Sequence, residues 1–97
     1  MVYTHGTWNV KEGHEGEFVR RWHELADWTI ANFPGARGTL LRDVEQPRRF
    51  VSFGPWPTAE HAERWRGAPE FANRIARIRE TLESFEPSTL QLVAEIS

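Results

Sequence analysis

The sequence predicts an α+β fold, a ferredoxin-like split β-α-β sandwich in which helices cover one face of a four-stranded antiparallel sheet. Three observations support this prediction: two segments with amphipathic helical periodicity, strand-like segments between them, and a short connection in mid-chain. The predicted order, β-α-β-β-α-α-β, is typical of that sandwich. A chain of 97 residues leaves no room for a second core, so residues 1–97 are expected to form a single domain.

The first third of the chain is predicted to form a strand and a long helix. Residues 2–11 alternate loosely between apolar and polar side chains, which is typical of a strand that ends at Gly13. Apolar side chains then recur at steps of three and four residues, which predicts an amphipathic helix over 14–32. Pro34-Gly35 ends this helix. Its apolar positions are Phe18, Trp22, Leu25, Thr29 and Phe33.

The middle of the chain is predicted as an antiparallel hairpin. Residues 36–44 and 48–54 are strand-like and are separated by a turn at Glu45-Gln46-Pro47. A connection of this length is typical of two adjacent antiparallel strands. The second of these strands is expected to end at Gly54-Pro55-Trp56-Pro57, because glycine and proline interrupt regular structure.

Two further helices and a last strand complete the predicted fold. Thr58 is a candidate N-cap for a short helix over about 58–66. Pro69 suits the first turn of the next helix, which is expected to continue until Glu86-Pro87-Ser88 breaks it. Residues 89–96 are predicted as the last strand. The helix after Pro69 is inferred from apolar residues at helical spacing, namely Phe71, Ile75, Ile78, Leu82 and Phe85.

Composition and charge argue against several classes of function. The chain carries 12 basic and 14 acidic residues without a basic stripe, so no nucleic-acid partner is expected. It has no apolar stretch long enough to span a membrane and no signal-like start, so we expect no membrane partner and a cytoplasmic location. The absence of cysteine excludes disulfides, thiolate metal sites and a cysteine nucleophile.

No cofactor and no metal are expected from the motifs. The four histidines, His5, His14, His23 and His61, are spread over three predicted elements and form no metal-binding pair at helical spacing. The glycines form no phosphate-binding loop, and the chain has no serine-nucleophile motif.

The predicted fold leaves one face of the sheet without cover. All helices lie on the other face, and an exposed apolar sheet face marks an interaction surface. We therefore expect a homodimer built sheet against sheet.

Three sets of residues, taken in order along the chain, carry a family resemblance. They are Val10-Lys11-Glu12-Gly13 with Glu17-Phe18; Phe33-Pro34-Gly35-Ala36-Arg37-Gly38 leading into Leu40-Leu41-Arg42-Asp43; and Trp56-Pro57-Thr58-Ala59-Glu60-His61 with Trp65 and Pro69-Glu70-Phe71. The chain resembles, over nearly its whole length, the antibiotic biosynthesis monooxygenase (ABM) group of dimeric α/β-barrel proteins. The resemblance implies a ferredoxin-like protomer that pairs its sheet with a second one, and a ligand cavity between sheet and helices.

The sequence can be compared, residue by residue, with two branches of this family. Haem-degrading relatives combine an Asn on the first strand, a Trp on the short helix and a His ten residues later. Trp65 matches this Trp, but Gly6 and Ile75 occupy the other two positions, which argues against haem degradation. Anthrone-oxidising relatives place an Asn four residues before the Trp that closes the third strand. Trp56 matches that Trp, and Ser52 replaces the Asn with a shorter hydrogen-bond donor.

The candidate site is an aromatic pocket with a few polar groups, a kind of pocket that binds small, flat organic molecules. A histidine is the natural base near neutral pH, and Arg, Ser or a Trp N–H can stabilise an oxyanion. Three of the candidates also have a structural alternative: Trp22 as core packing, Arg74 as a surface residue and His23 as a boundary residue. His5 could lie on either face of its strand. The catalytic candidates are His23, His5, Arg74 and Ser52, and the substrate-binding candidates are Trp22, Trp56, His61, Trp65 and Phe71.

These features and the resemblance together predict a cofactor-independent monooxygenase that acts on a small aromatic, phenolic or quinol-type substrate. The substrate would lose a proton and then supply the electrons that reduce O₂ in a dry pocket. The alternative is a non-catalytic ligand-binding or accessory dimer with the same pocket. A purely structural dimer would have no cavity of roughly 300 Å³ or more.

Overall fold

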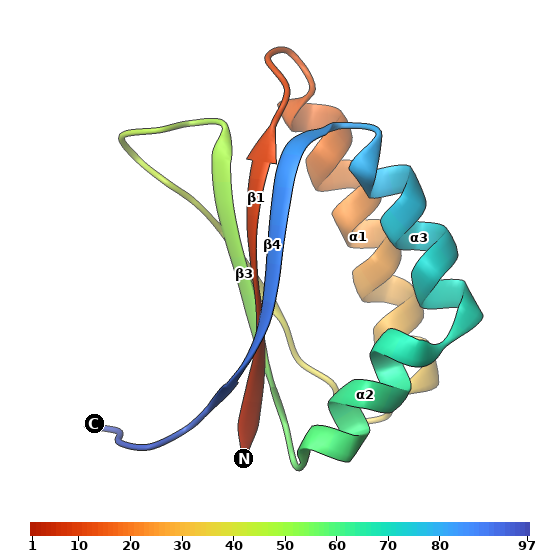
Figure 1. The fold of residues 1–97 in the computed structure, drawn as a ribbon, viewed down its shortest axis with the longest axis vertical. Coiled ribbons are helices and arrows are strands. Elements are labelled where there is room, and N and C mark those ends of the chain that lie inside the picture. Colours follow the sequence, from red (N-terminus) through yellow and green to blue (C-terminus); the bar gives the residue numbers. More distant parts are fainter.

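A computed structural model describes all 97 residues and has a sheet with helices on one face only (Figure 1). The strands are β1 (Val2–Val10), β2 (Thr39–Arg42), β3 (Arg49–Trp56) and β4 (Leu82–Gln91), and the helices are α1 (Glu15–Asn32), α2 (Ala59–Gly67) and α3 (Pro69–Arg79). The strand order is β2-β3-β1-β4, and all neighbouring strands are antiparallel. The predicted ferredoxin-like α+β fold is therefore confirmed.

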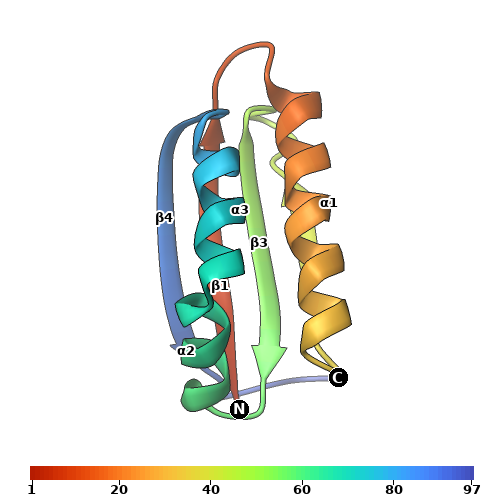
Figure 2. The same cartoon turned by 90° about the vertical axis from the view of Figure 1, so that its right-hand side faces the viewer.

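The helices form one layer over the sheet. Figure 2 shows α1 and α3 side by side in this layer, with α2 at the end where β3 finishes. None of the three helices combines the length and the apolar character needed to cross a membrane.

Alternation along β1 sets which side chains face the helices. Thr4, Gly6, Trp8 and Val10 are buried, whereas the residues between them are only half-buried. Because successive side chains of a strand point to opposite faces, the buried set faces the helices. Phe18, fully buried on α1, packs its ring against this set, with its centroid 5.5 Å from that of Trp8.

The boundary between the last helix and the last strand differs from the prediction. The helix ends at Arg79, and Leu82 and Phe85 belong to β4, which ends at Gln91. Leu82 pairs with Val10 of β1, and Phe85 stacks on Trp8 with ring centroids 4.0 Å apart. The expectation of helix to about residue 85 is thus wrong, and the last strand begins earlier and ends earlier than the predicted 89–96.

A β-bulge explains that error. The pairing register between β1 and β4 shifts between Asn9 and Val10, so one extra residue of β4 is accommodated there. The extra residue allows Leu82 and Phe85, three apart in sequence, to face the same side of the sheet. This spacing imitates a helix. Pro87 is tolerated within β4 because β4 is an edge strand with one unpaired side.

The hairpin strands also differ from their predicted bounds. β2 is shorter than residues 36–44, and β3 continues through Pro55 to Trp56 instead of ending at residue 54. Pairing between β2 and β3 reaches only as far as Thr39 opposite Phe53. Pro55 therefore lies where one side of β3 is already unpaired, so its missing N–H leaves no ladder bond unmade.

Candidate functional site

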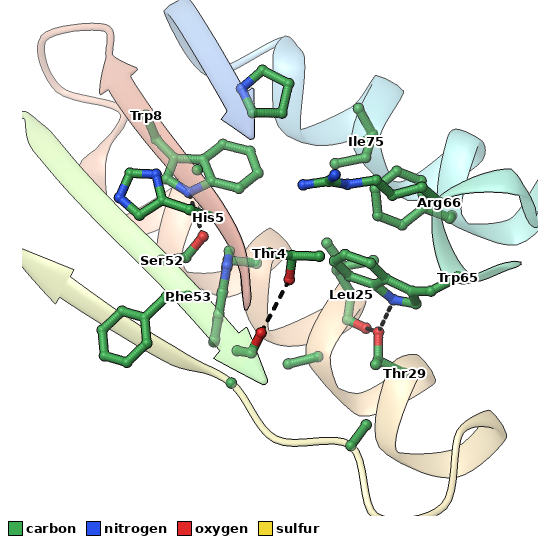
Figure 3. Close-up of a pocket in the computed structure, with 18 of the residues that line it drawn as sticks. Thr4, His5, Trp8, Leu25, Thr29, Ser52, Phe53, Trp65, Arg66 and Ile75 are labelled. Atoms are coloured by element: carbon green, nitrogen blue, oxygen red, sulfur yellow. Dashed lines mark hydrogen bonds between the residues drawn. The ribbon is translucent and has the colours of Figure 1, made fainter. Parts of the chain in front are cut away.

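A cavity of about 380 Å³ lies between the sheet and the helices, toward the α2 end of the molecule. It has the size of a small-molecule site, so a purely structural dimer without such a cavity is not supported. Figure 3 shows Thr4 and Ser52 lining it from the strands, and Leu25, Thr29, Trp65, Arg66 and Ile75 lining it from the helices. The aromatic side chains that face it are those of Trp8, Trp22, Trp56, Trp65, Phe71 and Phe85.

The aromatic walls are held by contacts between rings. The Trp65 ring lies 5.3 Å from Trp56 and 4.6 Å from Phe71, measured between centroids. Trp56 also meets Phe33 edge to face at 5.8 Å. Such pairs stabilise a fixed arrangement beyond the area they bury. They therefore join β3, α2, α3 and the residue that follows α1 around the cavity.

Three indole N–H groups along the cavity each donate to a side-chain hydroxyl. Trp8 Nε1 donates to Ser52 Oγ at 2.9 Å, and Trp65 Nε1 donates to Thr29 Oγ1 at 2.8 Å. Trp56 Nε1 donates to Thr4 Oγ1 at 3.2 Å. These bonds satisfy polar groups that would otherwise be costly to bury. They also occupy the N–H groups of three of the four tryptophans in the lining, which leaves that of Trp22 without a hydrogen bond.

The three hydroxyl groups differ in whether their own hydrogen is already used in a hydrogen bond. Thr29 Oγ1 donates its own hydrogen to the Leu25 carbonyl at 2.7 Å, and Thr4 Oγ1 donates to the Gly54 carbonyl at 3.5 Å. Ser52 Oγ accepts from Trp8 and makes no other hydrogen bond. Its O–H can therefore donate to a molecule in the cavity, and the bond that it accepts strengthens it as a donor.

Seven of the nine candidate residues contribute to the cavity lining, and the other two do not. Those that line it are His5, His23, Ser52, Trp22, Trp56, Trp65 and Phe71. His23 is exposed and also borders a second hollow between α1 and β2, which places it at the rim.

His5 contributes to the lining from the far side of the sheet. It lies between the inward-facing Thr4 and Gly6, and its Nδ1 is 3.4 Å from Ser88 Oγ. Figure 3 shows the His5 and Phe53 side chains on the side of the strands away from the helices. Of the two orientations that the sequence left open, the structure has the one that faces away from the helices.

Arg74 and His61 lie outside the cavity. The Arg74 guanidinium stacks over the Trp28 ring at 5.3 Å, and its Nη1 donates to the Glu70 carbonyl at 3.2 Å. His61 Nδ1 lies 2.7 Å from Thr58 Oγ1, and its backbone N–H donates to the same hydroxyl, which caps α2. Arg74 is thus engaged with α1 and its own helix, and His61 with the start of α2, and neither side chain lines the cavity.

A half-buried arginine that was not among the candidates reaches the cavity. Arg66, on α2, donates through Nη1 to Thr89 Oγ1 at 2.5 Å and through Nη2 to the Ser88 carbonyl at 2.8 Å. Burial lowers the pKa of its guanidinium, because removal from water disfavours the charged form. Its position next to Trp65 in the sequence could have indicated that it lies near the cavity. Its partners Ser88 and Thr89, however, lie where the sequence predicts the end of a helix and the start of the last strand.

No three His, Asp or Glu side chains come together in a way that could hold a metal ion. The only acid in the cavity lining is Asp27, which is exposed on α1. The polar chemistry of the cavity therefore depends on hydroxyl groups, a rim histidine and arginines.

Comparison with known proteins identifies the family. The sequence profile described as antibiotic biosynthesis monooxygenase (ABM) matches residues 1–77. The chain belongs to this family. Among curated proteins, none matches the sequence.

Solved structures share the ABM fold over nearly the whole chain. SnoaB from Streptomyces nogalater, a cofactor-independent oxygenase, is 22% identical, with TM-scores of 0.86 and 0.87 in two structures that cover 98% of this chain and 95% of SnoaB. A Deinococcus radiodurans protein that carries the ABM family name is 17% identical, with a TM-score of 0.86 over 100% of this chain and 97% of its own. A conserved protein from Methanosarcina mazei is 15% identical, with a TM-score of 0.83 over 93% and 90%. At these identities the likeness establishes the fold of this ABM protein.

Proposed function

We propose that this ABM protein is a cofactor-independent monooxygenase that oxidises a small aromatic, phenolic or quinol-type substrate. The observation that supports it most is a free hydroxyl donor, that of Ser52, inside an aromatic cavity of about 380 Å³. Membership of the family and the fold shared with SnoaB, a cofactor-independent oxygenase, support the same activity.

The proposed reaction needs no cofactor if the substrate supplies the electrons. In an anthrone-type substrate, a ring CH₂ group becomes a carbonyl. The carbon takes one oxygen atom from O₂, and the second oxygen atom leaves as water with the two hydrogens of the CH₂ group. Loss of a proton from the substrate comes first and leaves an enolate or phenolate that is rich enough in electrons to react with O₂.

The residues of the cavity suit the two demands of this chemistry. Ser52 can donate a hydrogen bond to the developing oxyanion, and the aromatic walls give that bond mostly apolar surroundings. His23 is the histidine on the helical side of the cavity and is our candidate for the base that takes the proton. Trp22, beside it on α1, is our candidate for the ring that the substrate stacks on.

Oxygen uptake by metal-free protein, measured with a panel of hydroquinones and anthrones, tests the proposal. We expect uptake above the spontaneous rate that is lost on heating. Ser52→Ala should lower the rate about 10²-fold, the cost of removing one oxyanion donor. Ser84→Ala is the matched control, because Ser84 is exposed on β4 and bonds only to Asn9 Nδ2.

Two results would contradict the proposed activity. One is an absence of uptake across the panel, which together with a ligand-dependent rise in melting temperature would favour the non-catalytic binding module. The other is equal turnover by folded Ser52→Ala and wild-type protein. His23→Gln tests the base separately, and unchanged turnover in that variant would remove His23 from the mechanism.

We further propose that the protein forms a homodimer through the face of the sheet that no helix covers. Leu41, Phe53 and Leu90 lie on that face and are 52%, 36% and 49% exposed. The C-terminal residues leave the sheet on the same side (Figure 1), and Val93 and Ile96 there are almost fully exposed. A second copy would bury both groups of apolar side chains, as an exposed apolar face requires.

Sedimentation equilibrium tests the dimer. We expect twice the mass of one chain for the wild type and the mass of one chain for a Leu41→Glu/Phe53→Glu variant. Ile30→Glu is the matched control, since Ile30 is exposed on α1, in the helix layer on the other face of the sheet. A wild-type protein with the mass of one chain at micromolar concentration would contradict the proposal.

A further inference from the structure

The charge balance of the cavity lining is opposite in sign to that of the chain. The whole chain has a net charge of −2. The lining, in contrast, contains Arg37, Arg66 and Arg79 and a single acid, Asp27. A cleft lined by one sign of charge concentrates ligands of the opposite sign. The lining therefore favours an anionic ligand.

Arg66 differs from the other two arginines because it is half-buried and they are exposed. None of the ion pairs in the structure involves Arg66, although Glu63 lies three residues before it on the same helix. A half-buried cation without an acidic partner is costly, and a bound anion would reduce that cost.

The hydrogen bonds of Arg66 leave donors unused. A guanidinium group carries five N–H donors, and the bonds to Thr89 Oγ1 and to the Ser88 carbonyl use two of them. The remaining donors are arranged in a planar fork that suits a carboxylate. The two protein bonds also fix the orientation of this fork before a ligand arrives.

The positions of Arg66 and Ser52 suggest how a ligand would lie. Figure 3 shows Arg66 reaching in from the helical side and Ser52 lying on the strand side, with Trp65 below Arg66 and Trp8 beside Ser52. A flat ring system between these groups would meet a cation at one end and a neutral hydroxyl donor at the other.

We propose that the cavity selects aromatic carboxylates and that Arg66 binds their carboxylate group. This inference rests on the proposed function in so far as the cavity is the substrate site. The carboxylate would bind to the unused donors of Arg66, and the reacting oxygen of the substrate would lie toward Ser52. Arg66 is then a specificity-determining residue that takes no part in the oxidation itself.

A matched pair of probes, 2-naphthoate and 2-naphthamide, tests the inference by isothermal titration calorimetry. The two molecules have the same ring system and differ in charge. We expect wild-type protein to bind the acid about tenfold more tightly or better, since hydrogen bonds between charged groups are the stronger kind. Arg66→Met, which keeps an unbranched apolar side chain but removes the guanidinium group, should remove this preference and leave the affinity for the amide nearly unchanged.

Two further variants sharpen the test. Arg66→Lys should keep part of the preference, because it retains the charge but not the planar fork. Arg64→Met is the matched control and should behave as wild type, since Arg64 is exposed on the same helix and does not line the cavity. If Arg66→Met fails to fold, the wild-type comparison and Arg66→Lys still decide the question.

The outcomes separate this inference from the proposed activity. Equal wild-type affinity for the acid and the amide, no detectable binding of the acid, or an intact preference in folded Arg66→Met would each overturn the role of Arg66. Tight binding of the acid without oxygen uptake would support the ligand class and contradict only the oxygenase. Oxygen uptake on neutral substrates without a preference for acids would contradict only the inference about carboxylates.

Discussion

The two ends of the space between sheet and helices are built from the same strands and helices but in different ways. At the end where α1 begins, Val10, Phe18 and Ile78 are almost fully buried and form an apolar cluster with Phe50 and Leu82. At the α2 end, Thr4 and Thr29 are buried beside tryptophans, and the cavity remains between them.

The packed end therefore contributes mainly to the stability of the domain, whereas the hollow end provides the space in which a ligand can bind. The packed end buries apolar area, which is the main stabilising contribution in a small domain. The hollow end loses part of that contribution and compensates with hydroxyl–indole bonds and ring contacts that keep its walls in place. Substitutions at the two ends should therefore have different effects, and the predictions below run from the largest effect to the smallest.

The largest difference is expected for the same substitution made at each end. Phe18→Ala should lower the free energy of unfolding by about 3–5 kcal/mol, because it leaves a hole in a fully packed region. Phe71→Ala should cost less than half as much, because Phe71 is half-buried and already borders the cavity. Urea unfolding at a single protein concentration measures both. Equal losses would show that the two ends do not differ in packing.

A smaller effect is expected from breaking one hydroxyl–indole pair. Thr29→Val keeps the shape of the side chain but leaves the Trp65 N–H without its partner. The expected loss is about 1–3 kcal/mol, the range for a buried donor left unsatisfied. Thr39→Val is the control, since Thr39 is exposed on β2. If thermal unfolding shows no difference between the two variants, the pair does not stabilise the cavity wall.

The smallest effect concerns the hairpin turn after β2. The backbone N–H groups of Glu45 and Gln46, together with Arg49, hold the pKa of Asp43 below its ordinary value of 3.8. A depressed pKa in the folded state stabilises the protein above that ordinary value, and the contribution is lost as the pH falls through the folded-state pKa. When the pH is lowered from about 6 to about 3, the melting temperature of Asp43→Asn should therefore fall less than that of the wild type. Identical pH profiles would contradict this.

The fold was predictable because its signals are local. The periodicity of α1, the N-cap Thr58 and the turn between β2 and β3 identify their elements correctly to within a few residues. The boundary between α3 and β4 was not predictable in this way. A bulge places Leu82 and Phe85 on one face of a strand at a spacing that also fits a helix, and only the pairing with β1 distinguishes the two.

The site was predictable in its aromatic character and less so in its polar groups. Trp22, Trp56, Trp65 and Phe71 are large apolar residues at core positions, and they line the cavity. The donors of Arg66 depend on where β4 lies beside α2, which is a long-range contact that periodicity does not encode.

Pro87 has a consequence for how copies of this chain can associate. It lies in the middle of β4, opposite Gly6, on a strand whose outer side has no neighbour. A strand added along that side would meet a position that cannot donate a hydrogen bond, so the ladder could not continue past it. Open-ended growth of the sheet from one chain to the next would have to use this side of β4, so Pro87 disfavours that kind of association.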